Sequence, residues 1–239
     1  MSIILAIETS QRTGSVAMRD RAGTVHVEPL ALATRHDDDL LPAIDRLLKR
    51  EGLSPHDLDE NAAVAVSIGP GAFTGLRIAV STAKMIAEAR RVKLVAVPSA
   101  LVVAGSLSET IRPGPVLIAL ASKNDTFWAT RLECASDGWR VVGTPGLVDA
   151  ASLDLSSLRT VVCDQHLPTA ARLRCEEAGV LTIEPRFEAA ACLAVAARML
   201  KQGEITDALS LAPLYPREPE AVSIWERHRA GASDAKSAR

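Results

Sequence analysis

Residues 62–92 read AAVAVSIGPGAFTGLRIAVSTAKMIAEARRV, and they hold an apolar run, a glycine-rich turn and a helical pattern in immediate succession. The apolar run at 62–68 predicts a buried strand, and the segment at 74–91 predicts a helix. Phosphate-binding loops occur in this context, between a strand and a helix. The glycine spacing fits neither the dinucleotide motif nor a Walker loop, which would need a Lys-Ser/Thr pair. The turn therefore either binds a phosphate in an uncommon way or only redirects the chain into the helix.

The pattern of strands and helices around this segment occurs twice along the chain. The first set has expected strands near 3–8, 15–19, 24–30, 62–68 and 92–98, and expected helices at 38–51, 74–91 and 99–111. The second set has expected strands near 115–122, 126–134, 139–144, 160–164 and 180–185, and expected helices at 168–178 and 188–202. A βββαβαβα unit used twice predicts the duplicated actin-like, ribonuclease-H-like (ASKHA) fold of the α/β class. We expect an N-terminal lobe at 1–111, a C-terminal lobe at 112–215, and a polar, partly disordered tail at 216–239.

The composition excludes several classes of protein. Hydrophobic residues make up 48% and charged residues 23% of the 239 positions, which is ordinary for a soluble globular protein. A net charge of −2 and an aromatic content of 3% provide neither a phosphate track nor a stacking platform for nucleic acid. The four cysteines include no C-x-x-C pair, and no apolar run is long enough to cross a bilayer. We therefore expect a cytoplasmic protein with no membrane contact, no structural metal and no cofactor.

The helix expected at 74–91 carries one narrow polar stripe, formed by Arg77, Ser81, Lys84, Glu88 and Arg91. The rest of its surface is mostly apolar or small and exceeds the single face that a helix buries on a sheet. Two explanations remain open: the helix at 38–51 covers this surface within the chain, or the two helices together bind a partner. In the second case the partner-binding residues are Leu40, Leu41, Ile44, Leu48, Ile78, Thr82 and Met85.

No catalytic or metal-binding group stands out. The histidines include no pair at helical spacing, and His36 beside three aspartates fits an acidic helix start better than a cation site. The first hairpin turn is where this fold binds phosphates when it binds a nucleotide, and a possible vestigial phosphate loop there consists of Glu8, Thr9, Ser10 and Gly14. The matching turn at 120–128, LASKNDTFW, and the candidate adenosine region at 161–170, VVCDQHLPTA, contain no glycine. A backbone without glycine cannot approach a phosphate or an adenine closely, so we expect no competent ATP hydrolysis.

Several stretches resemble the TsaB (YeaZ) family of tRNA threonylcarbamoyladenosine biosynthesis proteins. They are ILAIETS at 4–10, GSVAM at 14–18, RHDDDLLPAIDRLL at 35–48, SIGPGAFTGLRIAVSTAKMIA at 67–87 and APLYPREPEA at 212–221. Together they cover the N-terminal lobe well and the C-terminal lobe thinly. The sequence departs from the family pattern at Glu8, where Asp is common, at Ala72, where Ser is common, and at Pro216, where an aliphatic residue is usual.

The resemblance implies a scaffold without its own catalytic activity. TsaB proteins resemble degenerate paralogues of TsaD, the subunit that uses an H-x-x-x-H metal pair to transfer a threonylcarbamoyl group to the adenosine beside the tRNA anticodon. Here His36 has no second histidine four residues away. The family binds TsaD through its two N-terminal helices, and a small ATPase, TsaE, joins the assembly. The implied partners are TsaD and TsaE, with a homodimer when the protein is alone and with tRNA reached only through the complex.

On this interpretation the glycine-rich stretch turns a strand into a partner-binding helix. The residues of this strand–helix turn are Gly69, Pro70, Gly71, Thr74, Gly75 and Arg77, with Thr74 as the expected helix cap. One alternative is an ATP-dependent phosphotransferase or ATPase of the same fold, in which Glu8 or Asp125 would position magnesium. A second is a peptidase, for which the sequence sets out no nucleophile and base.

Overall fold

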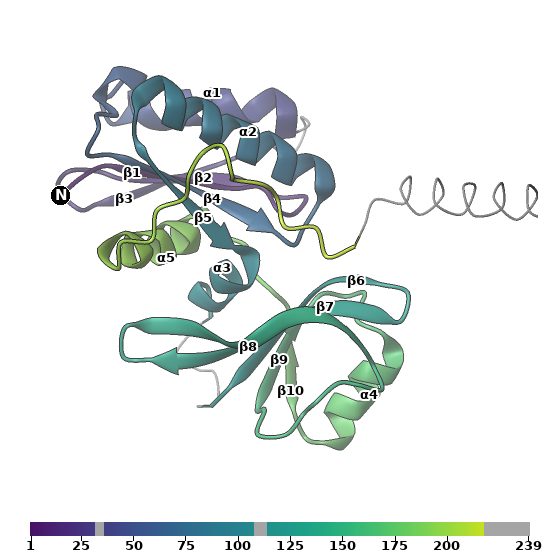
Figure 1. Cartoon of the computed structure of the whole chain (residues 1–239). Coiled ribbons are helices and arrows are strands. Elements are labelled where there is room, and N and C mark those ends of the chain that lie inside the picture. The colour runs from purple at the N-terminus through teal and green to yellow at the C-terminus, as the bar shows by residue number, and fades with distance from the viewer. Residues whose placement is uncertain (32–35, 108–113, 218–239) are drawn as a thin grey trace, which may run out of the picture.

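The computed structural model describes residues 1–31, 36–107 and 114–217 and contains two sheets of five strands each (Figure 1). The first sheet has the order β3-β2-β1-β4-β5 and consists of β1 (Ile4–Glu8), β2 (Ser15–Arg19), β3 (Val25–Pro29), β4 (Ala63–Gly69) and β5 (Lys93–Pro98). The second has the order β10-β9-β6-β7-β8 and consists of β6 (Val116–Lys123), β7 (Thr126–Ala135), β8 (Gly138–Asp149), β9 (Thr160–Cys163) and β10 (Leu181–Ile183). In each sheet the first three strands of the lobe pair antiparallel and the next two add in parallel, so the two lobes share one topology. This arrangement confirms the predicted duplicated actin-like fold.

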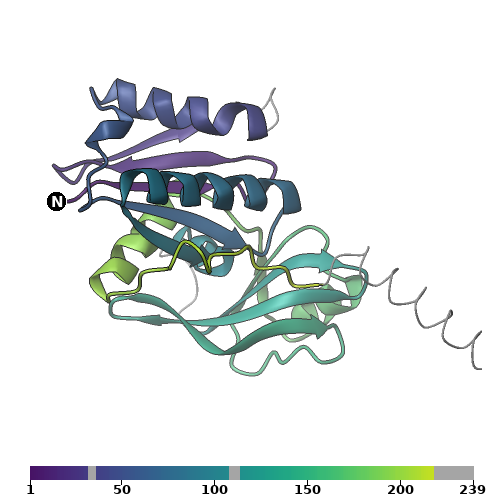
Figure 2. The same cartoon turned by 45° about the horizontal axis from the view of Figure 1, so that its top comes forward.

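Helices cover both faces of the first sheet, because its strands are apolar on both sides. Along β1, Leu5 and Ile7 join one buried cluster with α1 (His36–Arg50) and α2 (Phe73–Arg90). Ile4 and Ala6 belong to the opposite cluster, with α3 (Ser99–Gly105) and α5 (Ala189–Lys201). Figure 2 shows α1 and α2 lying side by side on the outer face. The first lobe is therefore a three-layer unit with α1 and α2 on the outside.

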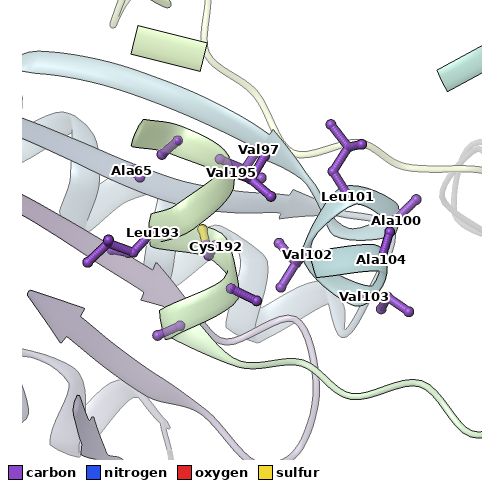
Figure 3. Close-up of a cluster of buried hydrophobic side chains, with 14 of the residues drawn as sticks. Ala65, Val97, Ala100, Leu101, Val102, Val103, Ala104, Cys192, Leu193 and Val195 are labelled. Carbon is purple, nitrogen blue, oxygen red and sulfur yellow. The ribbon is translucent and has the colours of Figure 1, made fainter. Parts of the chain in front are cut away.

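The two lobes share a hydrophobic core around α3 and α5. Figure 3 shows Cys192, Leu193 and Val195 of α5 beside α3, whose labelled side chains run from Ala100 to Ala104. Ile118 and Leu120 of β6 belong to the same cluster, so it extends from the first sheet to the second. The predicted C-terminal lobe at 112–215 thus contributes its last helix to the first sheet. Small alanine side chains allow this close packing of helices on a sheet.

The outer face of the second sheet is covered by α4 (Thr169–Glu177), whose buried Ala171 and Cys175 contact a third apolar cluster. No helix lies between β8 and β9, where residues 150–159 form turns and coil. In this segment Ser152 N donates to Asp149 Oδ1 at 2.7 Å and Ser156 N donates to Asp154 Oδ1 at 2.8 Å. Such local side-chain bonds compete with helix formation, so the second lobe departs here from a full βββαβαβα unit.

Most predicted elements are confirmed, with differences mainly at their ends. A 3-10 helix, Pro55–Asp57, follows α1 and is capped by Ser54, whose Oγ accepts a hydrogen bond from His56 N. The helix expected at 99–111 ends earlier, at Gly105, and β8 extends beyond 144 to Asp149. The side chain of His36 and the tail beyond residue 217 lie outside the described residues. In the described part of the chain, no helix has the length and apolar character needed to cross a membrane.

A C-terminal strap, residues 203–217, follows α5 and returns across the first lobe (Figures 1 and 2). It passes the free edge of β5, where Thr206 N donates a hydrogen bond to Leu94 O at 2.8 Å. It then reaches the end of β4, where Leu214 N donates to Ile68 O at 2.7 Å. The strap thus lies beside the glycine-rich turn.

Candidate functional site

The glycine-rich turn packs directly on the end of β1. Gly69 has a φ of +108°, which disfavours any residue with a Cβ. A Cβ on Gly71 would lie 2.3 Å from Ser10 O, and one on Gly75 would lie 2.2 Å from Thr9 O. The space that a phosphate would need beside Gly71 and Gly75 is therefore filled by the chain's own backbone.

Hydrogen bonds hold this contact in place. Ala72 N donates to Ser10 O at 2.7 Å, and Thr9 Oγ1 donates to Gly75 O at 2.8 Å. These bonds join residues more than 60 positions apart in the sequence. The sequence predicts the bend at Gly69. It contains no local signal that positions 71 and 75 must be glycine to leave room for the backbone of residues 9 and 10.

The start of α2 differs from the prediction. The residue that precedes the helix is Ala72, which makes no side-chain cap bond, and Thr74 lies exposed inside the first turn. The predicted cap at Thr74 is therefore wrong, because the helix begins one residue earlier than expected. Pro70 lies within the turn, between Gly69 and Gly71.

An exposed aromatic pair lies at this end of α2. The ring centroids of Phe73 and Tyr215 are 5.2 Å apart, and the guanidinium carbon of Arg77 lies 5.1 Å from the Phe73 ring centroid. Phe73 is 52% exposed and Tyr215, in the strap, is 39% exposed. Sequence reasoning missed this contact, because the strap reaches α2 from the far end of the chain.

The possible vestigial phosphate loop is buried. Glu8, Thr9 and Ser10 are at most 1% exposed, and a Cβ on Gly14 would lie 3.2 Å from Glu8 O. Ser10 N donates to Glu8 Oε1 at 2.6 Å, whereas Glu8 Oε2 has no hydrogen-bond partner among the described residues. Burial raises the pKa of Glu8, and hydrogen bonds from Ser10 offset only part of that effect. A buried carboxyl that does not line the cleft is poorly placed to hold magnesium there.

The cleft between the lobes has a volume of about 750 Å³ and is lined by residues 11–13, 164–166 and 184–188. Its charged side chains are of both signs, with Arg12 and Arg186 opposed by Asp164, Glu184 and Glu188. Neither the buried residues Glu8, Thr9 and Ser10 nor the exposed Asp125 lines it. In the described ranges there is no group of three or more His, Cys, Asp or Glu side chains suited to a metal ion. The carboxylates that line the cleft, Asp164, Glu184 and Glu188, therefore do not form such a group among the described residues.

The predicted helix pair divides into buried and exposed residues. Four of the seven predicted partner-binding residues are at most 9% exposed inside the first lobe: Leu40, Ile44, Leu48 and Thr82. Leu41 and Met85 are each 51% exposed, and Ile78 is partly buried. Leu40, Ile44 and Leu48 belong to the buried apolar cluster of the first lobe and, like Thr82, present little surface to a partner. The residues available for docking are Leu41, Ile78 and Met85.

Charged and polar side chains are also exposed on the two helices that carry the exposed apolar ones. All five residues of the predicted polar stripe on α2 are at least partly exposed. On α1, Arg46 donates to Asp39 and Glu28, and these contacts lower the pKa of Asp39 and keep Arg46 charged.

Comparisons with known proteins identify the family. A family model described as TsaD, tRNA N6-adenosine threonylcarbamoyltransferase, matches residues 15–137, just over half of the chain. The protein is 30% identical over 127 residues to the tRNA threonylcarbamoyladenosine biosynthesis protein TsaB of Haemophilus influenzae, covering 53% of this chain and 52% of that protein. The solved structure of YeaZ from Pseudomonas aeruginosa superposes with a TM-score of 0.73 at 22% identity, over 90% of this chain and all of that one. The chain belongs to the TsaB (YeaZ) family.

The range matched by the TsaD model covers most of the first lobe and the start of the second. The match covers 52%, 41% and 53% of the length of the TsaB proteins of Haemophilus influenzae, Bacillus subtilis and Escherichia coli. An uncharacterized protein of Mycobacterium tuberculosis is 27% identical over 227 residues, which is 94% of this chain and 96% of that protein. The YeaZ likeness, at its level of identity, is evidence for the TsaB fold alone.

Proposed function

We propose that this protein is a non-catalytic scaffold subunit of the complex that forms threonylcarbamoyladenosine in tRNA. In this role it binds the catalytic paralogue TsaD and supports it, within an assembly that also contains TsaE. Membership of the TsaB family supports the place in tRNA modification. The observation that carries the scaffold role is the filled glycine turn, in which Thr9 and Ser10 occupy the space beside Gly71 and Gly75. A turn closed in this way positions a helix and leaves no room there for a nucleotide phosphate.

The docking surface in this proposal is the outer face of α1 and α2. Leu41, Ile78 and Met85 provide apolar contact area, and burying a half-exposed Leu or Met is worth about 1 kcal/mol each. Arg77, Lys84 and Glu88 lie on the same helix as Ile78 and Met85, at least partly exposed, and would select a partner of complementary charge. When TsaD is absent, the same face pairs two copies of this chain as a homodimer.

Binding of tRNA is indirect in this proposal. A chain with a net charge of −2 and few aromatic residues lacks the basic surface that grips nucleic acid phosphates. The complex as a whole, located in the cytoplasm, would supply that surface. No cofactor is assigned to this subunit.

The alternative function is an ATP-dependent phosphotransferase or ATPase. The observation that favours it is the cleft of about 750 Å³, in which Arg12 and Arg186 could contact phosphate oxygens. Against it stand the buried position of Glu8 and the exposed position of Asp125 outside the cleft, since neither is placed to hold magnesium there.

A reconstitution distinguishes the two functions. Purified TsaD and TsaE from the same organism, with the enzyme that supplies the threonylcarbamoyl adenylate, are mixed with tRNA with and without this chain. We expect modified adenosine only when this chain is present, and no ATP turnover or micromolar ATP binding by this chain alone in calorimetry with magnesium. ATP turnover by the isolated chain would overturn the scaffold role and favour the phosphotransferase.

A further inference from the structure

The C-terminal strap is attached to the first lobe at two places. Along β5, Thr206 N donates to Leu94 O at 2.8 Å, and Ala96 N donates to Thr206 Oγ1 at 3.1 Å. Beyond β5, Leu214 N donates to Ile68 O, and Tyr215 packs on Phe73. The strap therefore has a fixed path as far as the turn between β4 and α2.

Arg217, at the end of the strap, connects it to the second lobe through hydrogen bonds. Its Nη1 donates to Ala121 O at 2.7 Å, and its Nη2 donates to Thr126 O at 3.0 Å and Thr126 Oγ1 at 2.7 Å. These acceptors lie near the end of β6 and at the start of β7, on either side of the turn that joins the two strands. Several oxygen acceptors converging on one planar guanidinium make a site that lysine cannot match, because its ammonium is a single point of attachment.

A second polar contact between the lobes lies at the other end of β7. There Gln202 Nε2, just after α5, donates to Asp137 Oδ2 at 3.1 Å, in the turn between β7 and β8. A strand of this length, ten residues, spans about 33 Å. The shared core around α3 provides the remaining contact. Arg217 and Gln202 thus hold the second lobe at opposite ends of its longest antiparallel ladder.

We propose that the strap fixes the angle between the two lobes, and that Arg217 does so through its hydrogen bonds to the second lobe. Without the Arg217 contacts, the α3 core and the Gln202 contact would hold the second lobe among the described residues, and the lobe could rotate about them. The strap would then set the width of the cleft from within the chain. The inference goes beyond the proposed function, because it concerns the lobes of this chain and requires no partner.

Single-molecule energy transfer between dyes on the two lobes reports a change in the angle as a change in the distance between the dyes. Dyes are placed at Lys49→Cys on α1 and Leu173→Cys on α4, two exposed helix positions on the outer sides of the two lobes, in a Cys134→Ser background. The other three cysteines are buried and will not react in the folded protein. High dilution keeps the chains monomeric. The parent should give one narrow distribution of transfer efficiency.

Replacing Arg217 with alanine should broaden and shift that distribution, and Arg217→Lys should restore it only in part. Arg50→Ala is the matched control, because Arg50 also bonds a backbone carbonyl and carboxylates, all within the first lobe or its own helix end. It should leave the distribution unchanged. A distribution in Arg217→Ala identical to the parent would overturn the proposal. Loss of helical circular dichroism in Arg217→Ala would overturn it too, since Arg217 would then hold the fold itself and not the angle.

Discussion

At Gly71 and Gly75, the absence of one side-chain carbon lets the turn after β4 close against β1. The Cβ positions lie 2.3 and 2.2 Å from backbone oxygens of Ser10 and Thr9, closer than real carbon–oxygen contacts allow. The obstacle is backbone on both sides and cannot move as a flexible side chain would. The glycines are thus required by packing between residues distant in sequence, and this requirement removes the need for a phosphate to explain them.

Gly75→Ala tests this explanation. Alanine is a better helix former than glycine by about 1 kcal/mol, so an unhindered position in α2 would gain stability. We expect instead a loss of about 1–3 kcal/mol in the free energy of unfolding, the usual cost of overpacking. Urea denaturation followed by circular dichroism gives the value. Gly146→Ala is the control, because nothing lies within 4 Å of its Cβ position. Equal stability of the Gly75 variant and the parent would contradict the packing argument.

Glu8 gives a pH-dependent prediction. Its pKa is raised by burial from an ordinary value of 4.5, so the unfolded chain ionises at a lower pH than the folded one. The stability contributed by the protonated form is complete below pH 4.5 and is lost as the pH rises toward the folded-state pKa. Relative to a Glu8→Gln variant, the parent should therefore lose stability above pH 4.5, by at most about 1.4 kcal/mol per pH unit. Denaturation curves at a series of pH values measure the difference, and a difference constant with pH would show that Glu8 is ionised in the folded protein.

At the scale of elements, α1 carries both buried and exposed apolar side chains. Leu41 is 51% exposed and Ile44, three residues on, is 5% exposed. Their spacing permits a shared face, and the sequence alone placed both at a partner interface. The structure separates them because Leu40, Ile44, Leu47 and Leu48 point to the sheet, whereas Leu41 lies beside that face.

Matched aspartate substitutions on α1 distinguish core from surface. Ile44→Asp should unfold the first lobe or destabilise it by several kcal/mol, because an unpaired carboxylate would be buried. Leu41→Asp should keep the parent circular dichroism while weakening the homodimer by about 2 kcal/mol, roughly 30-fold in dissociation constant. Light scattering across a dilution series measures the second effect. A folded Leu41→Asp protein that dimerises like the parent would place the homodimer contact elsewhere.

The sequence was sufficient for the strands and most helices, since their apolar periodicity and turn residues are local properties. It was insufficient for three contacts that depend on chain segments far apart. Because α2 is apolar around most of its surface, the sequence did not show which of its residues α1 and the sheet would bury. The packing of α5 on the first sheet depends on the apolar cluster that both lobes share around α3. No local pattern in the sequence specifies this contact. The strap reaches Phe73 and the β6–β7 hairpin from the other end of the described chain. The sequence around Tyr215 and Arg217 therefore did not indicate which residues they contact.

At the scale of the whole molecule, the fold retains the two lobes and the cleft of the actin-like architecture while the phosphate-binding features of the first lobe are closed. The first hairpin is buried at Glu8 to Ser10, the glycine turn is filled, and the exposed apolar residues Leu41 and Met85 lie on the outer helices. In the proposed function, binding of a partner on the outer face of α1 and α2 takes the place of catalysis in the cleft.

Complex formation with TsaD tests this account most directly. Purified chain and TsaD from the same organism are mixed, and the molar mass is measured by light scattering coupled to size-exclusion chromatography. Met85→Glu is compared with Leu173→Glu, a control in which an equally exposed helix residue, also 51%, lies on the second lobe. We expect a complex containing both proteins for the parent and for Leu173→Glu, and separate components for a folded Met85→Glu. The absence of any complex with the parent, or an undiminished complex with Met85→Glu, would contradict the role of α1 and α2 as the TsaD-binding face.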